Sequence, residues 1–166
     1  MMMEFSAKSG GSVDVRALRR MAKPDEILIG HPSGTELPYG LDAATLAQWL
    51  NDGTAAIPAR PYLLQGIRSE MSAIRKAMKL YLEEKRDNPN ATPVKVAVMA
   101  VGAVQEFVRG DYYKTTIPNA PGTIRGKGGK DTPLIDTGAL VDSVTYVVGK
   151  TEPSKTVTQD EIGAAA

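Results

Sequence analysis

Two long helical patterns separated by a turn constrain the fold of this chain more than any other feature. From Tyr62 to about Arg86, apolar side chains recur at three- and four-residue spacing, and charged side chains occupy the opposite face. The turn sequence at residues 87–90 interrupts this pattern. Thr92 and Pro93 then predict a capped N-terminus with proline at the first helical position, for a helix that ends near residue 109. Two antiparallel helices joined by a short turn form a helical hairpin.

Shorter elements flank the hairpin. Residues 26–30 and 143–148 are rich in β-branched side chains and predict two strands. Asp42 is a suitable N-cap for a helix that Gly53 would terminate. These elements predict an α+β fold in which a small mixed or antiparallel sheet is flanked by the two long helices, with an extended loop and terminal arms.

The same pattern divides the chain into three parts. Residues 1–22 form an N-terminal arm with a short helix that begins after Ser12, and residues 23–149 form the α+β domain. Residues 150–166 are a polar C-terminal tail. Within the domain, residues 115–133 contain prolines and glycines without a periodic pattern, so we expect a long loop that is either functional or disordered.

The composition excludes several classes of site. There is no cysteine, so neither a disulfide nor a thiolate metal site can form, and His31 is the single histidine. A Ser-His-Asp arrangement would have to include His31. The formal net charge of +1 lacks the basic excess of a protein that coats nucleic acid. We expect no metal, no cofactor and no catalytic residues.

Targeting signals are also missing from the sequence. The N-terminus lacks the basic and apolar regions of a signal peptide, and no apolar run approaches the about 20 residues of a membrane span. We therefore expect a soluble protein that is not exported.

Asp136, Thr137 and Gly138 form the Asp-Thr-Gly triplet with which aspartic proteases present one of two carboxylates that share a proton. A single copy would require a homodimer, and few residues follow it to build the rest of such an enzyme. The alternative is structural: Asp136 caps a short helix, and Gly138 permits a tight turn.

The long loop carries a small basic cluster, which consists of Arg125, Lys127 and Lys130. These side chains would contact DNA phosphates or an acidic partner, or they would be solvated on a flexible loop. Arg60 lies between Ala59 and Pro61, in a segment that proline restricts to extended backbone. Its guanidinium would anchor a turn or an interface through bidentate hydrogen bonds.

Two phrases in the sequence resemble those of one protein family. Residues 49–63, WLNDGTAAIPARPYL, resemble a segment common in neck and tail-completion proteins of tailed bacteriophages. Residues 133–144, PLIDTGALVDSV, look like the C-terminal signature of the same proteins, and a pair of helices and a glycine-rich loop separate the phrases here as in that family. The resemblance spans roughly residues 26–148.

The resemblance implies a virion structural protein, similar to the tail-terminator group, rather than an enzyme. Such proteins form a ring at the head–tail junction, and a hexamer is expected here. The implied partners are copies of the chain itself, tail tube or sheath proteins, neck proteins on the portal side, and DNA that passes through the lumen without sequence recognition. The implied location is the virion neck, after assembly in the host cytoplasm. The alternatives are another phage connector or minor capsid component, and an unrelated enzyme or binding protein.

Overall fold

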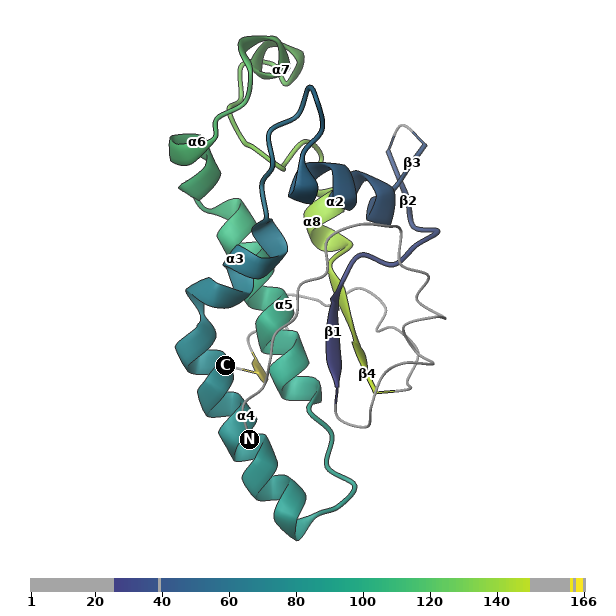
Figure 1. The fold of residues 1–166 in the computed structure, drawn as a ribbon, viewed down its shortest axis with the longest axis vertical. Helices are drawn as coiled ribbons and strands as arrows, with labels where there is room; N and C mark the ends of the chain where they lie inside the picture. Colours follow the sequence, from purple (N-terminus) through teal and green to yellow (C-terminus); the bar gives the residue numbers. More distant parts are fainter. Residues whose placement is uncertain (1–25, 39, 150–161, 163, 166) are drawn as a thin grey trace.

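The computed structural model describes residues 26–38, 40–149, 162, 164 and 165, so the predicted N-terminal arm lies outside the described residues. The described part contains seven helices and two antiparallel two-stranded sheets, which confirms the α+β class (Figure 1). The helices are α2 (Ala43–Asp52), α3 (Tyr62–Ser69), α4 (Met71–Asp87), α5 (Val94–Arg109), α6 (Tyr112–Thr116), α7 (Pro121–Gly126) and α8 (Ala139–Asp142). The strands are β1 (Ile27–Gly30), β2 (Glu36–Leu37), β3 (Leu41–Asp42) and β4 (Thr145–Val148).

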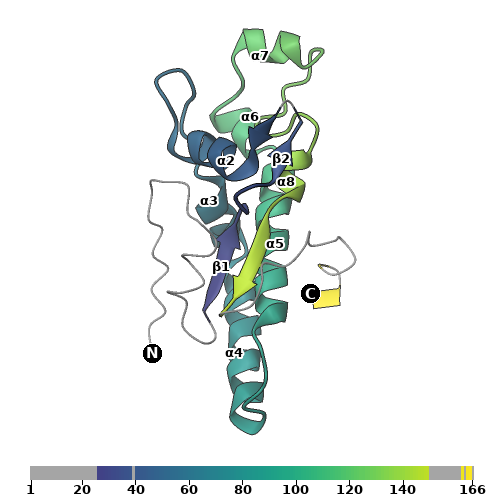
Figure 2. The same ribbon diagram turned by 90° about the vertical axis from the view of Figure 1, so that its right-hand side faces the viewer.

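Helix α5 is the centre of the molecule. Ten of its residues are buried, and they lie on more than one side of the helix. Helix α5 contacts α3 and α4 as well as both β1 and β4 (Figures 1 and 2). A helix that is apolar nearly all round has to be enclosed by other elements, and this one is enclosed by helices and by the sheet.

The two predicted strands pair with each other although almost the whole domain separates them in sequence. β1 and β4 are antiparallel, with Ile27 opposite Val148 and Gly30 opposite Thr145 (Figure 2). The sheet thereby closes the domain, because its two strands come from the start and the end of the described core. A second, smaller pair, β2 and β3, leads into α2.

The structure divides the first predicted long helix into two. α3 ends at Ser69 and α4 begins at Met71, with Glu70 in a non-helical conformation between them. α3 packs closely on α5, since a β-carbon at Gly66 would lie 2.6 Å from Cα of Val104. The Ser69 hydroxyl donates to the Gly66 carbonyl at 2.7 Å, which competes with helical hydrogen bonding at this point.

The predicted cap of the second long helix is wrong in detail. α5 begins at Val94, with Pro93 at the N-cap position and no side-chain cap. The Thr92 side chain is exposed and does not cap the helix. Pro93 is buried, so its ring also contributes to packing at this end of the helix.

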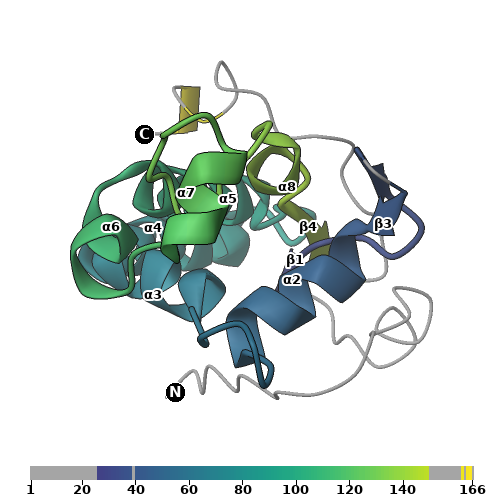
Figure 3. The same cartoon turned by 90° about the horizontal axis from the view of Figure 1, so that it is seen from above.

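The region predicted as an irregular loop, residues 115–133, contains regular structure. α6 ends within it, and α7 begins with Pro121 at the first helical position (Figure 3). Proline has no amide hydrogen to lose at that position, so it starts a helix as readily as it marks a loop. Residues 127–129 form a turn in which Gly128 and Gly129 both have positive φ.

Helix α2 matches its prediction closely. An oxygen of the Asp42 carboxylate accepts hydrogen bonds from the amide and the hydroxyl of Thr45, both at 3.0 Å. The other oxygen accepts from the amide of Gly34 at 2.7 Å, so one side chain caps the helix and ties it to the preceding turn. Gly53 ends the helix at a positive φ, and its amide donates to the Trp49 carbonyl.

Close packing at Gly66 predicts a clear difference between two glycine-to-alanine substitutions. Gly66→Ala should lower the free energy of unfolding by about 1–3 kcal/mol, because the new methyl group meets the α5 backbone. The control is Gly126→Ala in α7, where no atom lies within 4 Å of an added β-carbon, and this variant should be as stable as the parent or slightly more so. Urea unfolding measures both, and equal stability of the two variants would contradict the packing argument.

Candidate interaction groove

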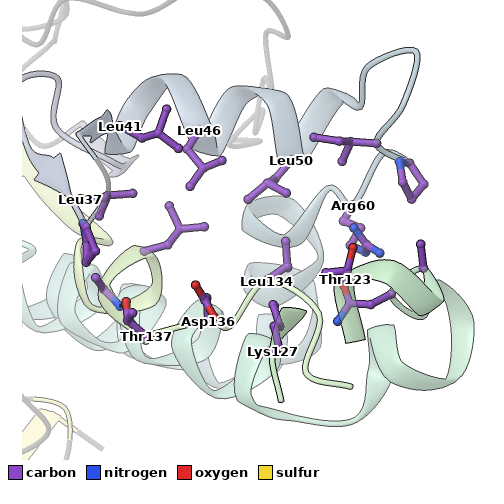
Figure 4. Close-up of a pocket in the computed structure, with 18 of the residues that line it drawn as sticks. Leu37, Leu41, Leu46, Leu50, Arg60, Thr123, Lys127, Leu134, Asp136 and Thr137 are labelled. Carbon is purple, nitrogen blue, oxygen red and sulfur yellow. Dashed lines mark hydrogen bonds between the residues drawn. The ribbon is translucent and has the colours of Figure 1, made fainter. Parts of the chain in front are cut away.

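A largely apolar groove of 490 Å³ lies between α2, with the loop that follows it, and the segment that runs from α7 to α8 (Figure 4). Leu46 and Leu50 extend from α2 toward Leu134 and Asp136 on the opposite wall (Figure 4). The larger aliphatic residues of the lining are Leu37, Leu41, Leu46, Leu50, Ile57, Leu134 and Leu140. The polar lining residues are Arg60, Asn119, Thr123, Lys127, Asp136 and Thr137.

Both phrases that carry the family resemblance contribute to this groove. The segment from Ile57 to Arg60 supplies one wall, and residues 134 and 136–140 supply the other. The two segments are separated by more than seventy residues in sequence, and α3, α4 and α5 lie between them along the chain. Folding on the α5 scaffold therefore brings the two sequence motifs to one surface.

Arg60 is a structural anchor inside the groove wall. Its side chain is only 4% exposed. Nε and Nη2 donate to the carbonyl of Ile117 at 3.2 and 3.0 Å, and Nη2 also donates to the carbonyl of Pro118 at 3.1 Å. Burial lowers the pKa of Arg60, and the charge of Asp131 opposes that change. The guanidinium thus fixes the entry to α7 through the bidentate geometry that arginine offers.

Lys127 also has an internal role, which its position in the sequence does not predict. Its ammonium group donates to the carbonyls of Thr132 and Ile135 at 3.0 and 2.6 Å. Burial lowers the pKa of Lys127, while the Asp136 carboxylate raises it. Of the three cations in the predicted basic cluster, only Arg125 and Lys130 are exposed.

Asp136 does not cap α8, contrary to the structural alternative drawn from the sequence. The N-cap residue of α8 is Gly138, which has a φ of 90° and no side-chain cap. The Thr137 hydroxyl accepts from the amide of Ala139 at 3.3 Å, so the neighbouring side chain makes the local hydrogen bond. The tight turn expected at Gly138 is confirmed by its left-handed backbone. Asp136 is exposed at the edge of the groove.

Leu134 carries backbone strain within the second motif. It has a φ of 65°, and it is the non-glycine residue with positive φ in the described part of the chain. Its side chain is buried, so packing holds the residue in a conformation that L-amino acids disfavour. Such strain persists only where the surrounding structure imposes it, and it accumulates at functional segments.

A part-buried network of hydrogen bonds around His31 was not predicted from the sequence. His31 Nδ1 lies 2.8 Å from the hydroxyl of Ser143, and the Tyr62 hydroxyl lies 2.7 Å from His31 Nε2. The Ser143 hydroxyl donates to the carbonyl of Leu140 at 2.8 Å, so it accepts from His31. Because 112 residues separate His31 from Ser143, no local sequence signal could have paired them.

The donors and acceptors of these hydrogen bonds indicate that Ser143, His31 and Tyr62 have a structural role and that Ser143 is not an activated nucleophile. Burial lowers the pKa of His31 to about 4 and raises the pKa of Tyr62, so a neutral imidazole accepts the tyrosine proton. The Ser143 proton is committed to a backbone carbonyl, and the third group is a tyrosine instead of the carboxylate that a Ser-His-Asp arrangement requires. The network ties the end of β1 to the start of α3 and to the end of α8.

Among the residues that the structure describes, no group of three or more histidine or acidic side chains could hold a metal ion. No helix in the described ranges has the length and apolar character needed to cross a membrane. Comparison with known proteins gives no further guide: no protein-family model, curated protein or solved structure matches the chain.

The Arg60 anchor predicts that loss of its guanidinium is costly. Arg60→Met should lower the free energy of unfolding by about 2–4 kcal/mol, because two carbonyls lose their donors in a buried setting. Asp136→Asn, in the same groove but exposed and without a role in capping α8, should change stability by less than about 0.5 kcal/mol.

Urea unfolding measures both variants. If Asp136→Asn were the more destabilising of the two, the assigned roles would be reversed. A peptide-cleaving activity that this asparagine variant abolished without loss of stability would instead favour the protease alternative.

The lowered pKa of His31 predicts acid-sensitive stability. The pKa of His31 is about 4 in the folded state against its ordinary 6.5, so the unfolded chain binds the extra proton between these values. Stability from this group is therefore complete above pH 6.5 and is lost as pH falls toward 4, by a total on the order of 3 kcal/mol.

His31→Gln is the matched control, because it removes the titrating group and leaves the carboxylates, which also titrate in acid, unchanged. Urea unfolding between pH 7 and pH 4.5 should show a steeper loss for the parent than for the variant. Parallel curves would show that the imidazole does not carry the effect.

Proposed function

We propose that this protein is a structural component of a tailed-bacteriophage virion, which forms a ring at the head–tail junction and joins the tail to the head. The proposal rests on the resemblance of two sequence phrases to neck and tail-completion proteins. One structural observation supports it above the others: both phrases line the same groove. Segments that jointly build one surface are what a shared functional signature would require.

The character of the groove favours a protein partner. Its walls are mostly aliphatic, and its two buried or partly buried cations already donate to backbone carbonyls. Leu41 on the groove and Trp49 on α2 are 37% and 42% exposed. Protein interfaces have an apolar core of this kind with polar groups at the rim.

A ring can form when each contact joins two different surfaces of the same protein. When the groove of one copy receives a different surface of the next copy, the contact is heterologous, and successive copies close into a ring if the rotation permits. A net charge of +1 does not oppose such stacking of copies. The partners proposed beyond the ring are tail tube or sheath proteins and the neck proteins on the portal side.

The proposed contact with DNA in the lumen involves two of the three cations in the basic cluster. Lys127 is bound to carbonyls, so contacts with phosphates would fall to Arg125 and Lys130, which are exposed on and after α7. Two cations per subunit give a weak, salt-dependent attraction without sequence recognition, as suits DNA that has to pass through. The alternative function is another connector or minor capsid component.

Leu41→Asp tests the groove as the assembly surface. A carboxylate at this partly exposed position should weaken self-association and binding to tail tubes by about tenfold or more, because an unpaired charge would be buried at the contact. Leu80→Asp on α4 is the control, since Leu80 is 57% exposed and does not line the groove. Both variants should keep the parent melting temperature.

Sedimentation of each protein with purified tail tubes, together with electron microscopy of the bound species, measures the effect. A parent protein that remained monomeric and unbound in the presence of tubes would refute the ring. Equal loss with both variants would remove the groove from the assembly surface and leave the ring itself intact.

A further inference from the structure

The C-terminal end of the chain docks on the central helix. Ile162 and Ala165 pack against the main hydrophobic core, although residues 150–166 have the composition of a polar tail. The contact is close at Gly102 of α5: a β-carbon there would lie 2.6 Å from Cγ2 and 3.3 Å from Cγ1 of Ile162. The missing side chain of Gly102 therefore forms a socket that the Ile162 side chain fills.

The socket lies on a side of α5 whose residues are buried. Gly102 itself is buried, as are Val98 and Gln105, which follow the same side of α5 at helical spacing. Both sheet strands and the α3 and α4 helices also contact α5, but the three atoms nearest to a β-carbon at Gly102 all belong to Ile162. An isoleucine seated over this apolar side removes from water a surface that would otherwise be exposed.

The connection between the domain and the docked residue is long and mostly polar in sequence. Residues 150–161 contain one aliphatic side chain, Val157, and otherwise mainly charged, hydroxyl and amide side chains. Twelve residues can span up to about 40 Å when extended. That reach is more than twice the radius of gyration of a folded chain of this length, about 15 Å, so the segment is long enough to reach an adjoining copy.

We propose that the Gly102 socket is an exchange site between subunits: in the assembled ring it receives Ile162 from the neighbouring copy. The occupant is thus the C-terminal end of a second copy of this chain, and the inference rests on the proposed ring. Ile162 makes the same contact with the Gly102 socket whether the two residues belong to one chain or to two, so exchange leaves every socket filled. An exchanged contact also connects one subunit to the next.

Proximity allows the neighbour's end to compete for the socket. Once two subunits touch elsewhere, the neighbour's tethered end also acts at an effective concentration in the millimolar range, as the subunit's own end does. Each copy donates one end and receives one, which is a heterologous arrangement and matches the closure of a ring. The free subunit has no neighbour, and its own end then covers the socket.

The absence of cysteine allows a direct test by disulfide formation. The β-carbons of residues 102 and 162 would lie close to the range of about 3.5–4.5 Å that a disulfide requires. Subunits with Gly102→Cys and differently tagged subunits with Ile162→Cys are mixed under assembly conditions and oxidised. A covalent dimer that carries both tags is expected, in excess of the dimers that each variant forms alone.

The double variant Gly102→Cys with Ile162→Cys completes this test. Exchange predicts a ladder of covalent oligomers on a non-reducing gel. Disulfides found only within single chains, at concentrations where the rings form, would overturn the proposal while the ring itself stands. Cross-linked subunits that did not bind tail tubes would support the exchange and count against the proposed function instead.

A second comparison covers the case in which cysteine at position 102 prevents folding. Ile162→Asp places a carboxylate in the apolar socket, and it should raise the concentration needed for half-assembly by tenfold or more, equivalent to about 1.4 kcal/mol. Ala164→Asp is the matched control, because the same charge at an exposed position two residues further on should leave assembly unchanged. A lower melting temperature in Ile162→Asp with unchanged assembly would show that the end serves only its own chain.

Discussion

The close approach of α3 to α5 at Gly66 and Val104 is the contact on which the rest of the domain depends. This contact sets the position of the N-terminal end of α3. Two residues at that end, Arg60 and Tyr62, form hydrogen bonds with distant parts of the domain. Arg60 holds the carbonyls that lead into α7, and Tyr62 holds His31 at the end of β1. A shift of α3 along α5 would therefore displace the groove and the sheet together.

Buried polar groups in this protein position backbone segments. The guanidinium of Arg60, the ammonium of Lys127 and the imidazole of His31 each connect segments that lie far apart in sequence or that contain no regular structure. Because these groups already have partners, they do not recruit a ligand by charge. The groove is left with aliphatic walls and a few exposed polar groups at its edge, so recognition there would depend on shape and on apolar contact.

Local patterns predicted the elements whose residues carry their own signal. The apolar spacing of α4 and α5, the β-branched runs of β1 and β4, and the Asp42 and Gly53 caps of α2 are all visible without the fold. The break at Glu70 was missed because the periodic pattern of apolar residues continues through it. The role of Arg60 was expected in kind, but its partners at 117 and 118 could not be named, since only the folded chain brings them together. The His31 pairing with Ser143 escaped prediction for the same reason.

The molecule offers two apolar contact surfaces of different construction. The groove is open and built from two loop-bearing segments, whereas the Gly102 socket is small, lies on a helix and is filled by a chain end. In the proposed ring, a groove that received a folded surface would set the angle between two copies. An exchanged end would set no angle, but it would resist separation because the end would have to leave its socket before two subunits part. The two surfaces would then act independently, since the strength of the joint could increase without any change in the angle at which the subunits meet.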